Sequence, residues 1–253
     1  MHVLIVLAHP EQKSFNAQLA RLCMEELRHQ GYTVETSDLY RMNFDPLERA
    51  CHYRDLKDPD WFDPQAQQKF ASETGSLPQD VSAEIGKLER ADLLILQYPM
   101  WWYTVPAILK GWLDRVLAYG DVYTSKKRYD HGRFRGRRAM LSLTTGGPEE
   151  TFTFNGRNAD IDLLLWPINF TLYYVGYEVL EPFVAFGVEG GLKYSSQEEA
   201  IRRLDRHRTA FREALADIDQ RPALRFNGSE DWDESGRLKV GVSGFSPFIR
   251  ANP

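Results

Sequence analysis

Residues 9–16, with the sequence HPEQKSFN, place polar and basic side chains immediately before a stretch with helical spacing. The free N–H groups at the start of a helix, together with the helix dipole, favour a bound phosphate. Ser14 and Asn16 could add side-chain donors, and His9 or Lys13 could supply positive charge. In the alternative interpretation, Ser14 only caps the helix and His9 is an ordinary surface histidine. Taken alone, this segment is compatible with both.

Residues 99–106, PMWWYTVP, hold three consecutive aromatic side chains between two prolines. Trp101, Trp102 and Tyr103 in so rigid a loop offer flat faces on which a planar heteroaromatic ring could stack. They could instead form a hydrophobic cluster that buries the next helix or a subunit interface. Because a loop that follows a buried strand usually stays exposed, the pattern favours a ligand.

Residues 144–148, TTGGP, form a third unusual segment. Gly146 and Gly147 permit close approach of the backbone and present N–H groups, and the adjacent threonine hydroxyls can add hydrogen bonds. An ordinary strand-to-helix turn could have the same composition. If the three segments converge, a phosphate at the first and a flat ring against the other two describe a flavin nucleotide.

Other classes of function lack their motifs. The first segment contains no glycine, so the glycine-rich phosphate loops are absent there, and no G-x-S-x-G nucleophile motif occurs. Six scattered histidines and two cysteines have no metal-binding spacing, so we expect no metal site. A formal net charge of −5 gives no global attraction to nucleic acid. The sparse cysteines fit a reducing cytoplasm, and no apolar run reaches the ~20 residues of a membrane span.

The hydrophobic pattern predicts the elements that must position these segments. Apolar or alternating runs predict strands at residues 3–8, 33–40, 93–98, 138–145 and 177–186. Helical spacing predicts helices at residues 15–30, 81–90, 106–118, 160–175 and 197–217, with a possible helix near 65–72. We expect Pro106 in the first turn of its helix and a break or kink at Pro167.

Strands that alternate with helices predict an α/β fold with a doubly wound parallel sheet. Five strands fit the flavodoxin-like order 2-1-3-4-5 at least as well as a six-stranded dinucleotide fold. In that order the carboxyl ends of strands one, three and four meet, which would bring the three segments together. We expect this domain to span residues 1–217, and residues 218–253 to form a loosely structured C-terminal extension.

Motifs spread over residues 2–215 resemble those of the NAD(P)H:quinone oxidoreductase (DT-diaphorase) family. They are HP and SFN within 9–16, SDLYRMNFDP at 37–46, LKDP at 56–59, PAILKGW at 106–112, TTGG at 144–147, LWPI at 165–168 and VLEP at 179–182. The resemblance implies a flavodoxin-like fold, a tightly bound FAD with FMN as the alternative, and a homodimer with two active sites at its interface. It further implies two-electron reduction of quinones by NADH or NADPH.

The resemblance also assigns roles to single residues. The implied flavin contacts are His9, Ser14, Phe15, Asn16, Pro99, Met100, Trp101, Trp102, Tyr103, Thr144, Thr145, Gly146 and Gly147. Trp102 and Tyr103 would also border the nicotinamide and quinone pocket. Tyr123 and Tyr174 would reach that pocket from the partner subunit. An arginine at 202 or 203 could serve the cofactor phosphates.

Two positions depart from the family. Well-known members carry a tyrosine and a histidine after the Gly-Gly turn, assigned to stabilising charge on the reduced flavin, where this chain has Phe152 and Asn158. Phenylalanine has no hydrogen-bonding group, and asparagine cannot take a proton. We therefore expect the N–H groups of Gly146 and Gly147 to supply most of this stabilisation.

Two other functions are compatible with the same fold. Close bacterial relatives of this family act as ancillary subunits of potassium-efflux systems, so the chain could bind and regulate a membrane protein through a peripheral contact. Nothing in the sequence marks a surface for that partner. The same flavin could also reduce a nitro compound, an azo compound or free flavin in place of a quinone.

Overall fold

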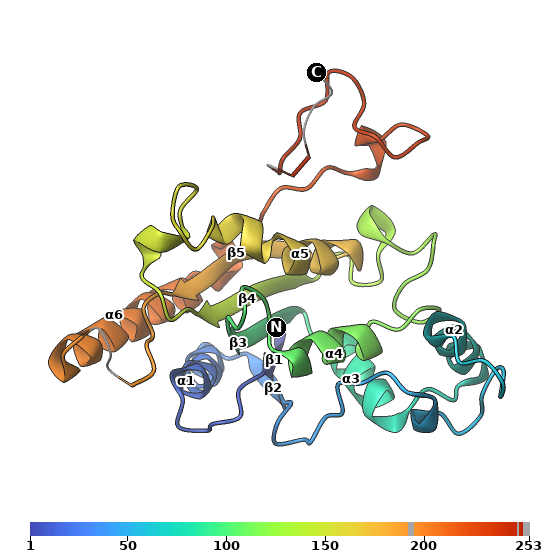
Figure 1. Cartoon of the computed structure of the whole chain (residues 1–253), viewed down its shortest axis with the longest axis horizontal. Coiled ribbons are helices and arrows are strands. Elements are labelled where there is room, and N and C mark those ends of the chain that lie inside the picture. The colour runs from blue at the N-terminus through green and yellow to red at the C-terminus, as the bar shows by residue number, and fades with distance from the viewer. Residues whose placement is uncertain (192–194, 247, 250–253) are drawn as a thin grey trace.

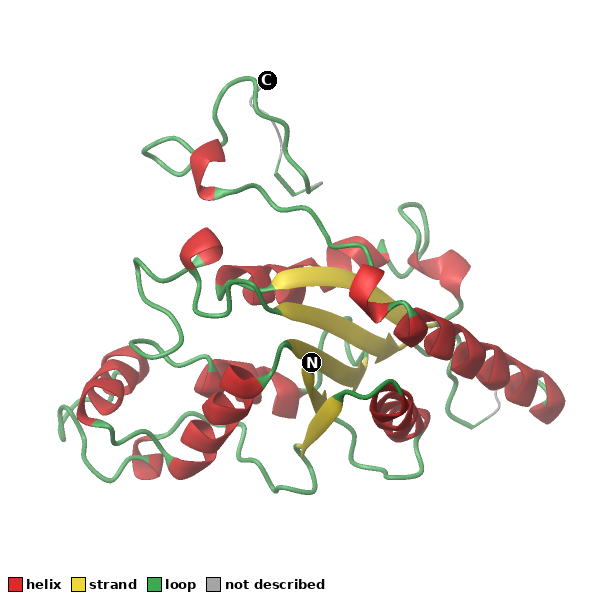
Figure 2. Ribbon diagram, turned by 180° about the vertical axis from the view of Figure 1, so that it is seen from behind, coloured by secondary structure: helices red, strands yellow, loops and turns green. Residues whose placement is uncertain are grey.

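The computed structural model describes residues 1–191, 195–246 and 248–249 of the 253-residue chain. Five strands form one parallel sheet in the order β2-β1-β3-β4-β5 (Figures 1 and 2). The strands are β1 (His2–Leu7), β2 (Thr33–Asp38), β3 (Leu93–Pro99), β4 (Arg138–Thr144) and β5 (Glu178–Ala185). The predicted fold class and strand order are therefore confirmed.

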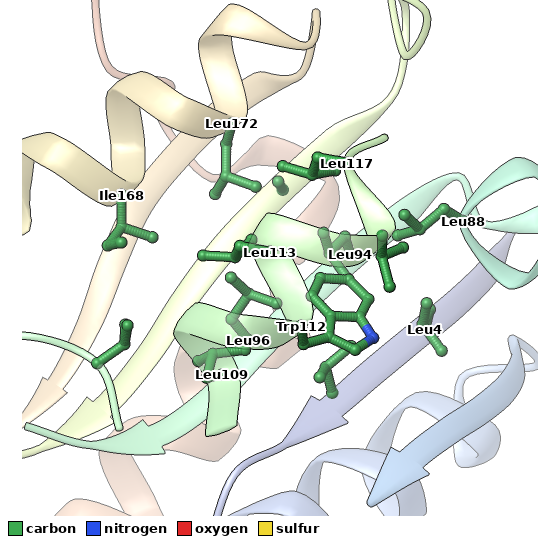
Figure 3. Packing of buried hydrophobic residues seen from close by; sticks show 14 of the residues in the cluster. Leu4, Leu88, Leu94, Leu96, Leu109, Trp112, Leu113, Leu117, Ile168 and Leu172 are labelled. Carbon is green, nitrogen blue, oxygen red and sulfur yellow. The ribbon is translucent and has the colours of Figure 1, made fainter. Parts of the chain in front are cut away.

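Helices cover both faces of this sheet (Figure 1). They are α1 (Phe15–His29), α2 (Pro64–Thr74), α3 (Gln79–Arg90), α4 (Ala107–Val116), α5 (Ile161–Tyr174) and α6 (Gln197–Ala216). Buried side chains of α1 and α6 form one core with one sheet face, and those of α3, α4 and α5 form a second core with the other. Trp112 of α4 is fully buried in the second core, close to Leu4 and Leu94 (Figure 3).

A helix break at Pro167 and a place for Pro106 inside the first helical turn were wrong predictions. α5 is continuous through Pro167, although proline lacks the N–H of one helical hydrogen bond. Leu165, Ile168 and Leu172 are buried on both sides of this position, so packing against the sheet stabilises the helix on either side of the proline. Pro106 has an extended backbone and precedes α4 as its N-cap residue, outside the first turn.

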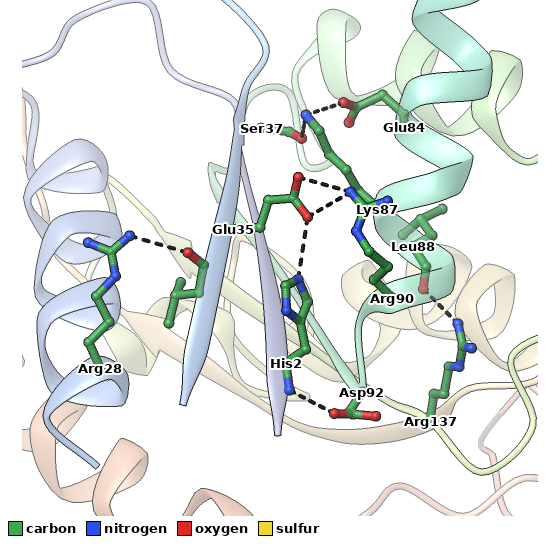
Figure 4. Close-up of polar contacts among 11 residues, drawn as sticks. His2, Arg28, Glu35, Ser37, Glu84, Lys87, Leu88, Arg90, Asp92 and Arg137 are labelled. Carbon is green, nitrogen blue, oxygen red and sulfur yellow. Dashed lines mark hydrogen bonds and ion pairs between the residues drawn. The ribbon is translucent and has the colours of Figure 1, made fainter. Parts of the chain in front are cut away.

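Charged side chains join β1, β2 and α3 (Figure 4). Arg90 Nη2 lies 3.0 Å from Glu35 Oε2, and His2 contacts the same carboxylate. Lys87 Nζ donates to the fully buried Glu84 over 2.6 Å. His2 begins β1 and Arg90 ends α3, so the contacts of these two residues lie at the end of the sheet opposite the three loops.

Beyond Asp217 the chain first pairs with β5, through hydrogen bonds of 2.8 Å at Pro222 and Leu224, and then lies over α5 (Figure 1). Its described residues form two short 3-10 turns, Ile218–Gln220 and Ser229–Asp231, and no longer helix or strand. Phe226 stacks on Tyr173 of α5 with ring centroids 4.4 Å apart. Within the described ranges, no helix is both long and apolar enough to cross a bilayer.

Candidate functional site

Buried polar side chains connect the three loops that the sequence singled out. Asn16 Nδ2 donates to Thr144 Oγ1 over 2.8 Å, and Gln97 Nε2 donates to Asn16 Oδ1 over 2.9 Å. Ser142 Oγ donates to Gln97 Oε1 over 2.7 Å. The Met100 N–H donates to the Thr144 carbonyl over 2.8 Å. These bonds fix the loops after β1, β3 and β4 at one edge of the sheet, where the strand order predicts a ligand site.

The aromatic loop after β3 ends in a strained turn. Trp102 and Tyr103 have left-handed backbones, with φ of +51° and +63°. Two backbone hydrogen bonds between Trp101 and Thr104, of 3.0 and 3.1 Å, close the turn. Bulky side chains rarely adopt this conformation, which costs about 1–3 kcal/mol per residue. Trp102 is 91% exposed and Tyr103 50% exposed, so the strained tip presents two aromatic rings to solvent.

A hollow of 260 Å³ lies between this turn and the Gly-Gly loop. Gly146 is exposed beside it, and a methyl group added there would meet no atom within 4 Å. The N–H groups of Gly146 and Gly147 have no acceptor among the described residues. The hollow therefore combines aromatic rings with two nearby free donors; its lining is Met100, Trp102, Tyr103, Thr145, Gly146, Phe152 and Asn158.

Phe152 and Asn158 both lie beside Gly147. A Cβ atom at this glycine would come within 2.9 Å of Asn158 Nδ2 and 3.1 Å of Phe152 Cε2. Asn158 Nδ2 donates to Thr151 Oγ1 over 2.8 Å, and Phe152 is buried against Phe186. Both side chains thus line the hollow without a group that titrates there.

The loop after β1 reaches the amino end of α1. Ser14 caps the helix, because its Oγ accepts from the Ala17 N–H over 3.1 Å. The N–H groups of Phe15 and Asn16 have no acceptor in the described part of the chain. The helix cap and the free donors are both present, so a capping role for Ser14 is compatible with a phosphate site at this helix end.

The Asn16 side chain differs from its expected role as a ligand donor. It is 3% exposed, and its amide is bonded to Thr144 and Gln97. The Phe15 ring is also buried, beneath the Arg208 guanidinium at 5.4 Å. The donors that these two residues offer to the loop are therefore their backbone N–H groups.

His9 was expected as a possible source of positive charge, and its surroundings disfavour that charge. Burial lowers the pKa of the His9 imidazole below its ordinary value, outweighing the hydrogen bond at Glu11. Its Nδ1 accepts from the Glu11 N–H over 3.0 Å, so the neutral ring carries its proton on Nε2. His9 therefore offers one neutral donor, and Lys13 is exposed beside it.

The two threonines of the third loop organise the loop itself. Thr144 accepts from Asn16, as described above, and Thr145 Oγ1 donates to the Gly147 carbonyl over 2.9 Å. Both residues are buried. Their hydroxyls were expected to bond to a ligand, but that of Thr144 is bonded to Asn16 and that of Thr145 to the Gly-Gly backbone.

Other predicted residues lie away from the hollow within one chain. The rings of Tyr123 and Tyr174 are 5.5 Å apart, and both line a separate cavity of 330 Å³ beside α4 and α5. Arg203 Nη2 is bonded to Glu189 over 2.7 Å, and Arg202 pairs with Glu198 on the exposed side of α6. None of these side chains reaches the hollow in the described chain.

Gln97 and Ser142 were missed by the analysis of the sequence. They are register partners on β3 and β4, and both are fully buried. The signal was available, because each is a polar residue with apolar neighbours on both sides in its strand. A buried amide or hydroxyl needs a partner, which points to another polar group at the same level of the sheet.

Comparisons with known proteins agree with this geometry. A profile of the flavodoxin-like fold matches residues 1–208. NAD(P)H dehydrogenase (quinone) 1 of Cavia porcellus is 43% identical over 187 residues, covering 73% of this chain and 68% of that protein. Ribosyldihydronicotinamide dehydrogenase (quinone) of Mus musculus is 44% identical over 199 residues, covering 78% and 84%.

Solved structures extend the similarity to most of the remaining chain. A Klebsiella pneumoniae protein, provisionally named a quinone reductase, superposes with a TM-score of 0.87 and 33% identity, covering 96% of this chain and 97% of that one. An NAD(P)H:quinone oxidoreductase of Methanothermobacter marburgensis superposes with a TM-score of 0.66 and 28% identity, covering 87% and 97%. The chain belongs to the flavodoxin-like family of NAD(P)H:quinone oxidoreductases.

Proposed function

We propose that this protein is a flavin-dependent NAD(P)H:quinone oxidoreductase. The observation that supports this most directly is the hollow at the strand ends, where exposed aromatic rings face a loop with free N–H donors. A bound flavin would supply the redox chemistry, by accepting a hydride from NAD(P)H and passing it to the acceptor. The relatives named above as quinone dehydrogenases support the acceptor class.

The residues present fit a flavin nucleotide. The N–H groups of Phe15 and Asn16 at the start of α1 suit a phosphate, and the neutral His9 adds an Nε2 donor beside them. The open space over Gly146 leaves room for a flat ring close to the backbone. Trp102 and Tyr103 are the side chains that would border this ring. We infer FAD in preference to FMN from the family resemblance.

One hollow that serves both substrates implies ping-pong kinetics. NAD(P)H and the quinone would each stack beside Trp102 and Tyr103, so one has to leave before the other binds. The hollow is shallow and open, which suits exchange of flat molecules. Initial rates measured at several fixed quinone concentrations should give parallel double-reciprocal lines. Intersecting lines would mean that both substrates bind together.

We further infer a homodimer. Trp101, Trp102 and Tyr103 are consecutive exposed aromatic residues, with 40%, 91% and 50% of their surface exposed. Exposed aromatic groups of this kind usually belong to interfaces. A dimer would let Tyr123 and Tyr174, which lie far from the hollow of their own chain, border the hollow of the partner. Sedimentation at nanomolar concentration should find a dimer, and an active monomer would contradict this.

The acceptor class is tested by turnover. Purified protein loaded with FAD should reduce naphthoquinones and benzoquinones with NADH or NADPH faster than nitro compounds, azo dyes or free flavin. A preference for one of the latter classes would reassign the enzyme. If no acceptor is reduced but the protein is captured by potassium-efflux components from membranes, the regulatory function would be favoured.

A further inference from the structure

A second cavity, of 660 Å³, lies apart from the hollow, between residues 125–131, α5 and the C-terminal extension. Figure 1 shows the light-green loop that contains residues 125–131 beside one end of α5, and the extension above that helix. Four aromatic side chains line the cavity: Tyr129, Phe170, Tyr173 and Trp232. Tyr129 has a left-handed backbone with φ of +51°, a conformation that is strained for a bulky residue.

The cavity is also basic. Lys126, Arg128 and His131 line it, and no acidic residue does so within the described chain. Residues 126–138 contain seven Lys and Arg residues and one Asp, although the whole chain has a net charge of −5. The Lys126 and Arg128 side chains form no ion pair with any described residue. Their charges are therefore free to meet a negatively charged ligand.

The neighbouring Asp130 does not neutralise these charges by ion pairing. Its carboxylate accepts from the Ser229 N–H over 2.6 Å and from the Tyr173 hydroxyl over 3.2 Å. Through these two bonds it joins the extension to α5. Asp130 lines an adjoining cavity that shares Tyr129, His131 and Tyr173 with the first.

The aromatic lining continues toward the substrate residues of the proposed function. Tyr129 and Tyr174 are in edge contact with ring centroids 4.9 Å apart, and Tyr174 contacts Tyr123 at 5.5 Å. Tyr173, which also contacts Tyr129, stacks on Phe226. A ligand bound in the basic cavity would therefore lie beside the tyrosines that we assign to the quinone and nicotinamide pocket.

We propose that this cavity binds the charged part of a planar aromatic anion and makes the enzyme prefer anionic over neutral aromatic substrates. The inference deepens the proposed function and rests on it for the identity of the substrate. Lys126 and Arg128 attract the sulfonate, carboxylate or phosphate group, and the Trp232 and Tyr129 rings pack against the planar part. An anionic quinone and a pyridine nucleotide both combine a negative charge with a planar ring. Measuring reduction by NAD(P)H and oxidation by the quinone separately distinguishes them.

Equilibrium binding tests the cavity without turnover. Calorimetry would compare naphthalene-2-sulfonate with naphthalene-2-sulfonamide, which has a similar shape and no charge at neutral pH. The sulfonate should bind about tenfold more tightly at low ionic strength, because it meets two exposed cations, and the difference should shrink in about 0.5 M salt. Lys126→Ala with Arg128→Ala should remove this difference and leave sulfonamide binding within twofold.

A matched control removes two positive charges elsewhere. Arg90→Ala with Arg212→Ala changes the net charge equally, at exposed ion pairs with Glu35 and Glu26. This control should keep the preference for the sulfonate. Equal binding of the two probes to the native protein, or equal losses in the two double variants, would overturn the proposal.

The half-reactions then identify the substrate. With the FAD-loaded protein, the Lys126 and Arg128 double variant should lose about tenfold in kcat/KM for a naphthoquinone sulfonate but not for the uncharged naphthoquinone, if the acceptor is the anion. Slower reduction by NAD(P)H alone would instead assign the cavity to the nucleotide. Absent turnover with retained sulfonate selectivity would contradict the proposed oxidoreductase function while supporting the cavity. Turnover without charge selectivity in binding or in either half-reaction would contradict the cavity.

Discussion

Asn16 and Thr144 are joined by a buried hydrogen bond of 2.8 Å across 128 residues of sequence. Gln97 donates to the same Asn16 amide over 2.9 Å, so one side chain connects the start of α1 to the carboxyl ends of β3 and β4. Asn16 is therefore a positioning residue in our account. It holds the free N–H groups of α1 at a fixed place relative to the Gly-Gly loop.

Asn16→Ala should loosen this connection. The substitution leaves Gln97 Nε2 and Thr144 Oγ1 without a partner in a buried place, which should lower the free energy of unfolding by about 1–3 kcal/mol. Flavin affinity should fall with it. Urea unfolding and flavin titration measure the two effects. Gln79→Ala removes an exposed amide at the start of α3 and should stay within about 0.5 kcal/mol of the native protein. Native-like unfolding of the Asn16 variant would contradict the positioning role.

Trp102→Gly should separate stability from binding. The tryptophan is 91% exposed and has a φ of +51°, so glycine relieves strain while little packing is lost. We expect the flavin-free protein to gain about 1 kcal/mol in its free energy of unfolding. The same variant should bind quinones and NAD(P)H more weakly, because the ring that borders the hollow is gone. A less stable flavin-free protein would show that the conformation is not strained.

Phe152→Tyr with Asn158→His should restore a donor and a titratable group beside Gly147. A charge-assisted hydrogen bond to the reduced flavin contributes roughly 1.5–3 kcal/mol. We expect a flavin that is easier to reduce and a rate of reduction by NAD(P)H on the order of tenfold higher, since about 1.4 kcal/mol corresponds to one decade in rate. Stopped-flow absorbance and redox titration measure both. Equal rates and potentials would mean that the two positions lie away from the charged edge of the ring.

The free energy of unfolding should decrease as the pH falls below the ordinary pKa of histidine. Burial lowers the pKa of His9 and of His207 below their ordinary value of 6.5. The unfolded chain then binds protons that the folded chain resists, so the free energy of unfolding should rise from about pH 5 to pH 7. Each histidine adds at most about 1.4 kcal/mol per pH unit to this slope.

His207→Gln checks this assignment. Glutamine can still donate to the Phe186 carbonyl, which His207 Nε2 contacts at 2.8 Å, but it does not titrate. Urea midpoints between pH 5 and pH 8 should therefore vary less steeply for this variant. An unchanged dependence on pH would mean that other groups dominate the window.

The sheet and the convergence of the loops could be predicted from the sequence, because β1, β3 and β4 are nearly uninterrupted apolar runs. Parallel strands buried on both faces require that pattern, and the strand order determines which loops meet. The direction of individual side chains could not be predicted. Asn16 and Thr144 belong to segments that were expected to contact a ligand. Their side chains instead point into the protein interior, where they bond to each other.

The backbone conformation of individual residues could not be predicted from the sequence either. The sequence places aromatics between two prolines, but only the paired hydrogen bonds of Trp101 and Thr104 force Trp102 into a left-handed conformation. An interruption of α5 was expected at Pro167, because proline in a helix interior lowers the stability of the helix. The packing against the sheet that offsets this loss cannot be read from the sequence. Tertiary contacts decided both cases.

Binding of a flavin tests the central claim most directly. FAD added to the purified protein should give absorption bands near roughly 375 and 450 nm that stay with the protein on gel filtration. Gly146→Ala should fold like the native protein, since its methyl group meets no atom within 4 Å, but should bind less flavin because that group occupies the space over the loop. The native protein should bind FAD at micromolar concentration or below. Failure to retain FAD or FMN at that concentration would contradict the account.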